Sequence, residues 1–227
     1  MERKALYEII ADKLEFTIVS DLSGDKQKLP SEQRLATAFG VSRPVIREAI
    51  KILKARGLIE SRQGAPTFIK AYGVEDFQKS LERIAHAQNV TMEQIFEVRV
   101  ALELATAQLA ARNSTQEDLK MLQEVNNQMR SPNAGKHELA DADTLFHVTL
   151  AKCSKNPLLV VMTEAFSGQL KKWIQTTVNE NTKVDGVAFH EKLIEAIERG
   201  DEDKARNLMQ AHLVLSMRNF EKNNEEK

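Results

Sequence analysis

The chain has 227 residues, 42% of them hydrophobic, which is enough for one large or two small domains with real cores. Aromatic residues are few, at 5%, and the single cysteine, Cys153, excludes an internal disulfide. No apolar run approaches the length of a membrane span, and the first residues are amphipathic rather than typical of a signal peptide. We therefore expect a cytoplasmic protein with no membrane partner.

Charge is distributed unevenly although the net charge is only -1. Residues 1–70 contain 13 Lys or Arg against 9 Asp or Glu, whereas residues 71–227 contain 19 against 24. This asymmetry indicates a polyanionic partner for the first part of the chain. We predict two domains, a basic one at residues 1–72 and an acidic one at residues 73–227.

The first seventy residues are predicted to form three helices and a hairpin. Apolar residues recur at helical spacing in residues 3–20. Ser31 is a good N-cap for a second helix, which Gly40 ends, and Ser42 begins a third helix that runs to Gly57. The segments "LIESR" and "TFIK" then predict two short strands. This order is that of a winged helix-turn-helix.

The remainder of the chain is predicted to be helical almost throughout. Thr91 with Gln94, and Ser114 with Glu117, have the spacing of capping boxes. The fold class is therefore mainly α, with the winged helix-turn-helix followed by an all-α bundle of about seven helices. The predicted helices are 75–88, 92–112, 115–129, 137–154, 156–179, 186–199 and 202–222.

The third helix has the pattern of a DNA-reading helix. Its apolar residues Ile46, Ala49 and Leu53 repeat at a spacing of three to four, so they face inward and leave the N-terminal end exposed. An arginine fork can bond two acceptors on one guanine edge, and hydroxyl and helix N–H groups suit phosphate. The alternative is an ordinary solvated face. The residues that we expect to face DNA are Ser42, Arg43, Pro44, Val45 and Arg47.

Residues 5–70 resemble the GntR family of bacterial transcription regulators. The resemblance is carried by "LPSEQRLA", "VSRPVIREAI" and "GLIE" followed by "RQG". Two departures are the wing tip "QGAPTF" and the segment "SGDKQK", where the family often has a Pro-Gly turn. The resemblance implies contacts with double-stranded DNA from Arg34, Arg43 and Arg47, and from a wing tip near Gln63 and Gly64 in the minor groove.

Three histidines on three predicted helices lie on apolar faces. His147 follows Asp143 by four residues, and His190 and His212 lie on the two helices that come last. Any one of them is more often a satisfied core histidine than a ligand. Imidazoles buried without partners cost free energy, however, and a divalent cation would satisfy all three. Spacing alone leaves a polar core cluster and a metal site about equally favoured.

Residues 92–216 resemble the FCD ligand-binding domain of the FadR subfamily of GntR regulators. The resemblance is carried by "FEVRVALE", "DTLFH", "NPLL", "FHEKLIEAIERGDEDKA" and "MQAHL". It implies a divalent metal bound by Asp143, His147, His190 and His212. One oxygen and three nitrogens suit zinc, nickel, manganese or iron and do not choose among them.

Arg99 lies on a largely apolar face of the second domain. It either forms an internal ion pair, for instance with Glu103, or clamps an anionic effector through its bidentate guanidinium. The FCD resemblance implies the second role, with an acid as the effector.

These features predict a transcription regulator rather than an enzyme. We expect a homodimeric repressor on a pseudo-palindromic operator, controlled by a small organic acid or sugar acid at the metal. The alternative from another class is a metal-dependent hydrolase carried on a DNA-binding module, since open metal positions could activate water. A third interpretation makes the metal purely structural.

Overall fold

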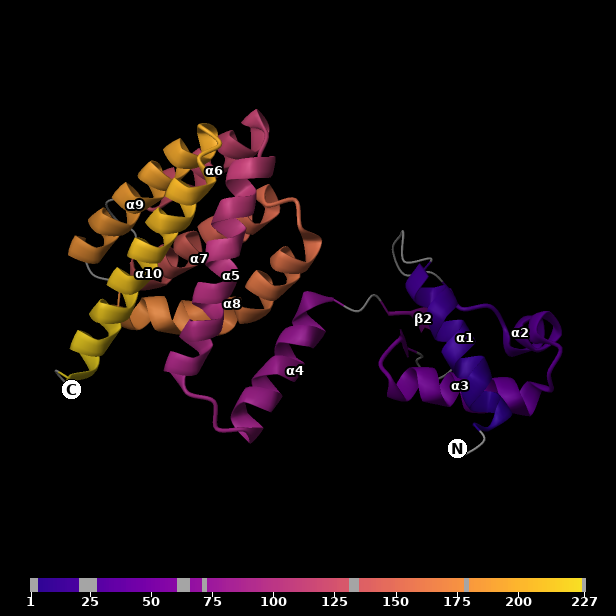
Figure 1. Cartoon of the computed structure of the whole chain (residues 1–227). Coiled ribbons are helices and arrows are strands. Elements are labelled where there is room, and N and C mark those ends of the chain that lie inside the picture. The colour runs from indigo at the N-terminus through magenta and orange to yellow at the C-terminus, as the bar shows by residue number, and fades with distance from the viewer. Residues whose placement is uncertain are drawn as a thin grey trace. The chain divides into compact units, whose positions relative to one another are not determined.

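The computed structural model describes residues 4–20, 28–60, 66–70, 73–130, 135–177 and 180–225. The chain divides into two compact units, Met1–Gly73 and Val74–Lys227 (Figure 1). Each unit has a hydrophobic core of its own, made of residues from that unit alone. None of the helices among the described residues is long and apolar enough to cross a membrane.

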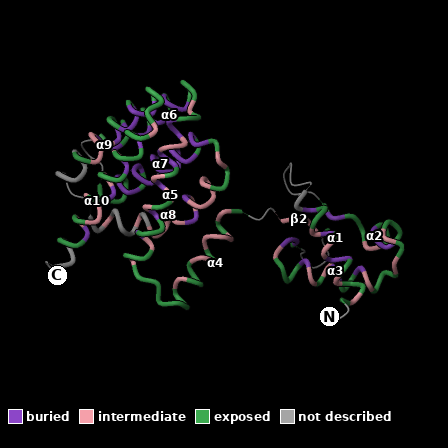
Figure 2. Tube along the Cα trace, viewed as in Figure 1, coloured by how far each residue is buried: buried purple, intermediate pink, exposed green. Residues whose placement is uncertain are grey.

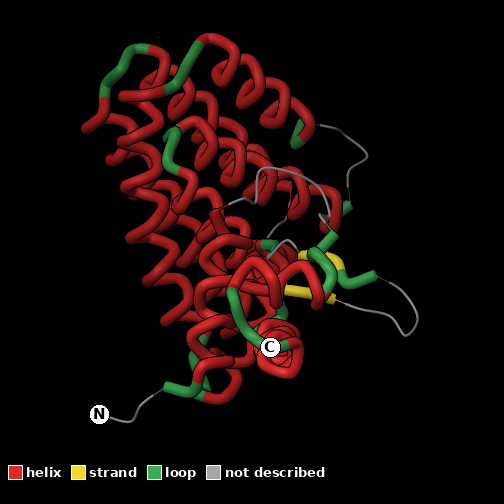
Figure 3. Tube along the Cα trace, turned by 90° about the vertical axis from the view of Figure 1, so that its right-hand side faces the viewer, coloured by secondary structure: helices red, strands yellow, loops and turns green. Residues whose placement is uncertain are grey.

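The described part of the first unit contains three helices and a two-stranded antiparallel sheet, drawn yellow in Figure 3. Ile59 pairs with Ile69, and Glu60 pairs with Phe68. The predicted winged helix-turn-helix is thus confirmed. The elements are α1 (Leu6–Ser20), α2 (Glu32–Phe39), α3 (Arg43–Ala55), β1 (Ile59–Glu60) and β2 (Phe68–Ile69).

Local capping and burial explain how the first unit positions α3. The Ser31 hydroxyl accepts a hydrogen bond from the Arg34 N–H, and Gly40 ends α2 with a φ of 63° that favours glycine. Ile46, Ala49 and Leu53 of α3 are fully buried in the core that α3 shares with α1. Because these residues occupy one face, the start of α3 remains exposed to solvent.

The described part of the second unit contains seven helices, as predicted for the bundle. The predicted bounds lie within three residues of the observed ones, except that the ninth helix begins at Glu180 rather than at residue 186. Its start was missed because residues 180–185 are polar apart from Val184 and so show no apolar periodicity that would indicate a helix. The helices are α4 (Val74–Ala87), α5 (Met92–Asn113), α6 (Gln116–Gln128), α7 (Lys136–Cys153), α8 (Pro157–Thr177), α9 (Glu180–Glu198) and α10 (Glu202–Glu225).

Helix α7 lies in the interior of the second unit. It packs against α5, α6 and α8, and most of its residues are buried, as the purple segments of Figure 2 show. A helix buried on nearly all sides is part of the core rather than a cover for it. Its polar residues Asp143 and His147 are therefore carried into the interior of the bundle.

The capping boxes differ in part from the prediction. Thr91 and Gln94 form a complete box, as predicted. The second box is Thr115 with Asp118, one residue beyond the predicted pair Ser114 and Glu117. The N–H of Ser114 instead donates to the Ala110 carbonyl and ends α5, so the hydroxyl that caps α6 comes from the next residue.

Candidate metal centre and nucleic-acid interface

The predicted DNA-contacting residues of α2 and α3 lie on an exposed surface of the first unit. Ser42 occupies the N-cap position of α3 but makes no capping hydrogen bond with its side chain. Gln63 and Gly64, predicted at the wing tip, lie outside the described residues. The residues that the structure places on this surface are Arg34, Ser42, Arg43, Pro44 and Arg47, all of them exposed.

Glu32 joins this surface, although the sequence reasoning did not select it. Its Oε2 atom lies 3.2 Å from Arg47 Nη2 and 3.8 Å from Arg43 Nη2. One carboxylate on α2 thus accepts a hydrogen bond from Arg47 and lies within ion-pair distance of Arg43, two of the predicted DNA contacts on α3. The signal that could have revealed it is an acidic residue in the first turn of α2, next to a basic face.

The four predicted metal ligands converge in the second unit. Asp143 and His147 come from α7, His190 from α9 and His212 from α10, and one ligand atom from each lies within 4.8 Å of the others. His147 Nε2 is 3.5 Å from Asp143 Oδ2, and His190 Nε2 is 3.8 Å from Asp143 Oδ1. Asp143, His147 and His190 are buried, and His212 is partly buried. This group can hold a metal ion.

One nitrogen of His190 lacks a hydrogen-bond partner. His190 Nδ1 lies 3.1 Å from Asn126 Oδ1, an acceptor, so Nδ1 carries the proton and donates it. His190 Nε2 is then unprotonated, and its lone pair is buried on the side of the ring near Asp143. This atom has no hydrogen-bond partner among the described residues. Such an orphaned acceptor is costly unless a ligand satisfies it. A cation between Asp143 and His190 would do so.

His147 is held by a buried ion pair on α5. Arg99 Nε donates to Glu103 Oε1 at 2.6 Å, and Arg99 Nη2 lies 3.2 Å from His147 Nε2. Glu103 Oε2 lies 2.7 Å from His147 Nδ1, although the pair lacks the alignment of a hydrogen bond. The ion pair considered from the sequence is therefore present. A carboxylate beside the far nitrogen of a ligating histidine is a common means of orienting it.

Burial dominates the electrostatics of the four-residue group. It raises the pKa of Asp143, lowers the pKa of His190 well below its usual value, and lowers the pKa of His212 to about 3. Burial also pushes the pKa of Glu103 upward, but Arg99 and His147 hold that pKa below its usual range. Neutral imidazoles are the form that binds metals, and a cation would compensate the Asp143 charge.

The arrangement is better suited to binding than to hydrolysis. Hydrolysis would need a general base near the metal, and the two carboxylates that adjoin the group in sequence or in space are both engaged. Glu103 pairs with Arg99, and Glu191, which follows His190, pairs with Arg130. Glu191 is also about half exposed rather than facing the centre.

Sequence reasoning missed Asn126, because a polar residue in the run "VNNQ" carries no pattern that would single it out.

Comparisons with known proteins agree with this organisation. The model of bacterial regulatory proteins of the gntR family matches residues 6–69, and the FCD domain model matches residues 94–215. The HTH-type transcriptional regulator LutR of Bacillus subtilis is 34% identical and covers 82% of this chain and 88% of its own length. The HTH-type transcriptional repressor NanR of Escherichia coli K12 is 30% identical and covers 94% of this chain and 83% of its own length.

Two further matches are informative. The Glc operon transcriptional activator of Escherichia coli K12 is 28% identical over 78% of this chain and 72% of its own length. The solved structure of Streptococcus agalactiae GntR has a TM-score of 0.73 and 28% identity, covering 94% of this chain and 99% of that one. The matched domains and curated relatives are regulators of transcription and not enzymes.

Proposed function

This chain belongs to the gntR family of bacterial regulatory proteins and carries an FCD domain, and from that premise we propose how its DNA binding is controlled. It is a homodimeric repressor that binds a pseudo-palindromic operator. A small carboxylate effector, bound at a divalent metal in the second unit, changes that binding. The relevant domains are residues 1–72 for DNA and 73–227 for effector, metal and dimerisation.

The observation that carries the metal proposal is the unpartnered Nε2 of His190. It lies beside Asp143 Oδ1, while Asn126 fixes the proton on the opposite nitrogen. His147 and His212 complete the donor set, which suits zinc, nickel, manganese or iron. When bound, the ion supplies positive charge and open positions that attract a carboxylate.

Arg99 supports the effector proposal. Arg99 is 93% buried, its guanidinium contacts both Glu103 and His147, and its Nη1 has no hydrogen-bond partner among the described residues. A buried donor with unused hydrogen-bonding capacity beside a metal group is suited to an anionic ligand. Arg99 would orient the carboxylate, and Glu103 would orient Arg99.

Repression and dimerisation rest on the relatives and on symmetry. NanR, named a repressor, matches more of this chain than the Glc operon activator does. In a dimer, two copies of α3 would contact two half-sites of the operator, separated by one helical turn of DNA or a multiple of it. Because the dimer is two-fold symmetric, we expect the operator to be a pseudo-palindrome. Reporter transcription with and without the regulator gives the direction of control, and sedimentation equilibrium gives the oligomeric state.

Metal content tests the centre. We expect purified protein loaded with a divalent ion to lose bound metal when His190→Ala is introduced, because one of four ligands is removed. His86→Ala is the matched control, since His86 is exposed on α4. Elemental analysis per chain gives the result, and full occupancy in His190→Ala would contradict the assignment.

Thermal unfolding tests the effector. The full chain is melted with small carboxylates and sugar acids, with added metal and again after chelation. A ligand that binds the folded state alone raises the melting temperature, so an effector bound at the metal stabilises the loaded protein and not the chelated one. Stabilisation by metal with no response to any acid would instead support a purely structural ion.

A further inference from the structure

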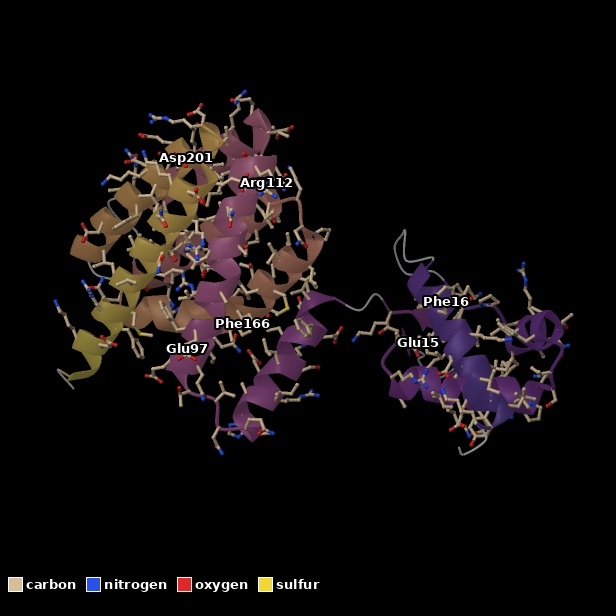
Figure 4. The ribbon with its side chains drawn as sticks, viewed as in Figure 1. Glu15, Phe16, Glu97, Arg112, Phe166 and Asp201 are labelled. Atoms are coloured by element: carbon tan, nitrogen blue, oxygen red, sulfur yellow. The ribbon has the colours of Figure 1, made fainter. Side chains whose placement is uncertain are left out.

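A pocket lies between α5 and α8, next to the metal-binding group. Ile95, Phe96 and Leu102 line it from α5, and Phe166, labelled in Figure 4, lines it from α8. Arg99 and Glu103 belong both to this pocket and to the contacts of His147. The pocket and the metal-binding group therefore share a wall.

Four polar atoms of the pocket residues are buried without hydrogen-bond partners among the described residues. They are Arg99 Nη1, Glu103 Oε2, Thr163 Oγ1 and Gln169 Oε1, and of these Glu103 Oε2 lies beside His147. Arg99 and Thr163 are each 93% buried. Orphaned polar atoms of this kind are rare in folded proteins, and several in one pocket indicate a ligand.

Thr163 stands out from other buried threonines of this unit. Thr106 and Thr144 satisfy their hydroxyls by donating to the carbonyl four residues earlier, at 2.8 and 2.7 Å. Thr163 also lies within a helix, where the same hydrogen bond could form, yet its hydroxyl has no partner in the part of the chain that the structure describes. Its hydroxyl thus remains available to a molecule in the pocket.

We propose that this pocket binds the apolar chain of the effector, which is a monocarboxylate with a short hydrocarbon chain rather than a sugar acid. The inference rests on the proposed function, since the carboxylate lies between Arg99 and the metal. The hydrocarbon chain packs against Ile95, Leu102 and Phe166. The Thr163 hydroxyl donates to the carboxylate rather than facing the chain.

The lining discriminates between the two classes of acid. A sugar acid carries a hydroxyl on almost every carbon, and most of these hydroxyls would lose water against Ile95, Leu102 and Phe166. A buried hydroxyl without a partner is strongly unfavourable, and Thr163 and Gln169 can satisfy few of them. Each methylene buried against the same side chains is favourable instead, by about fourfold in affinity.

The experiment is a calorimetric titration of the full-length, metal-loaded protein with acetate, propionate, butyrate and pentanoate, and with gluconate. We expect affinity to rise by about fourfold per added carbon until the pocket is full, with gluconate weaker than butyrate. Leu102→Phe fills the pocket and should weaken pentanoate binding more than acetate binding. Val98→Phe, at a 43% exposed position of α5, should behave as the parent protein does.

The outcomes separate this inference from the function on which it rests. Equal affinities along the series, or tighter binding of gluconate, would overturn the apolar pocket and leave a metal-dependent acid effector in place. Binding of none of these acids to the loaded protein would overturn both. If Leu102→Phe does not fold, the chain-length series in the parent protein still decides the question.

Discussion

At the scale of single residues, Glu32 affects the charge of the surface predicted to face DNA. Its carboxylate lies close to both Arg43 and Arg47. The two arginines are exposed and Glu32 is partly exposed, so each ion pair contributes little to stability. We therefore expect Glu32 to matter in binding, where it would compete with DNA for the two guanidiniums.

Replacing Glu32 with Gln should weaken sequence discrimination. We expect binding to unrelated DNA to rise by about two- to fivefold, since an opposing charge worth up to about 1 kcal/mol is removed. The ratio of operator to unrelated-DNA affinity should fall because Arg47 loses its orienting partner. Fluorescence anisotropy titrations at fixed salt measure both affinities.

Arg47→Ala serves as the comparison for Glu32→Gln. It should reduce the difference in binding free energy between operator and unrelated DNA by about 1–3 kcal/mol, because the guanidinium predicted to contact a base edge is lost. The helical content should not change. Unchanged discrimination in both variants would show that neither side chain reads the operator.

Stability of the metal-free protein should fall as the pH drops below about 6.5. Burial lowers the pKa of His212 from 6.5 to about 3 and also lowers that of His190, so the unfolded state binds these protons first. The free energy of unfolding then decreases toward acid pH, by at most about 1.4 kcal/mol per pH unit for each histidine. Urea denaturation with a chelator, from pH 7.5 to pH 4.5, measures this slope.

His212→Gln isolates the contribution of one histidine. Asp143, with its raised pKa, acts in the opposite direction at lower pH, so the two proteins must be compared rather than the parent curve alone. We expect the variant to have the shallower slope. Identical slopes would mean that His212 keeps an ordinary pKa in the folded protein.

At the scale of elements, helix ends determine how α5 leads into α6 and how α5 is held to α10. The Thr115 hydroxyl accepts from the Asp118 N–H, and Asp118 also pairs with Lys155 at 2.6 Å, near the end of α7. At the same end of the bundle, Arg112 of α5 pairs with Glu202 of α10 at 2.6 Å, near the labelled Arg112 and Asp201 in Figure 4. These contacts join α6 to the segment that follows α7, and α5 to the start of α10.

Removing the α6 cap should destabilise the second unit. Thr115→Ala should lower the free energy of unfolding by about 0.5–2 kcal/mol, because an N-terminal N–H loses its acceptor. Ser114→Ala is the matched control and should change little, since it is the backbone of Ser114 that ends α5. Urea denaturation compares the two variants, and a larger loss in Ser114→Ala would place the cap where the sequence first suggested.

At the scale of the whole molecule, the two hydrophobic cores are separate. The core of the first unit is formed by residues between 10 and 59, and the large core of the second by residues between 96 and 220. A unit with its own core has the main requirement for folding alone. The metal-binding group, Arg99 and the pocket all belong to the second unit.

A fragment of residues 73–227 should therefore unfold cooperatively and bind as much metal per chain as the full protein. It should not bind the operator, because α2 and α3 are removed. Circular dichroism melting and elemental analysis measure both properties. A fragment that melts without a cooperative transition would show that the proposed boundary at residues 72 and 73 cuts through a folding unit.

The sequence by itself was sufficient for the elements and for the chemistry of their side chains. The spacing of Ile46, Ala49 and Leu53 predicted which face of α3 is buried, and the spacing of Asp143 and His147 placed two donors on one face of α7. Both are properties of a single helix, so local periodicity and capping residues are enough to predict them. The first residues of α9 were missed because the method depends on apolar periodicity, which residues 180–185 do not show.

Only the tertiary structure decided which of these faces meet. It brought His190 and His212 to Asp143, and it placed Glu103 next to His147 and Asn126 next to His190. In the pocket that Arg99 also lines, it left the Thr163 hydroxyl without a partner among the described residues. Contacts between helices far apart in the chain depend on how their side chains pack together, and no spacing along one helix encodes them. The residue types could thus be predicted from sequence, whereas the lone pairs and orphaned donors that indicate ligands required the folded molecule.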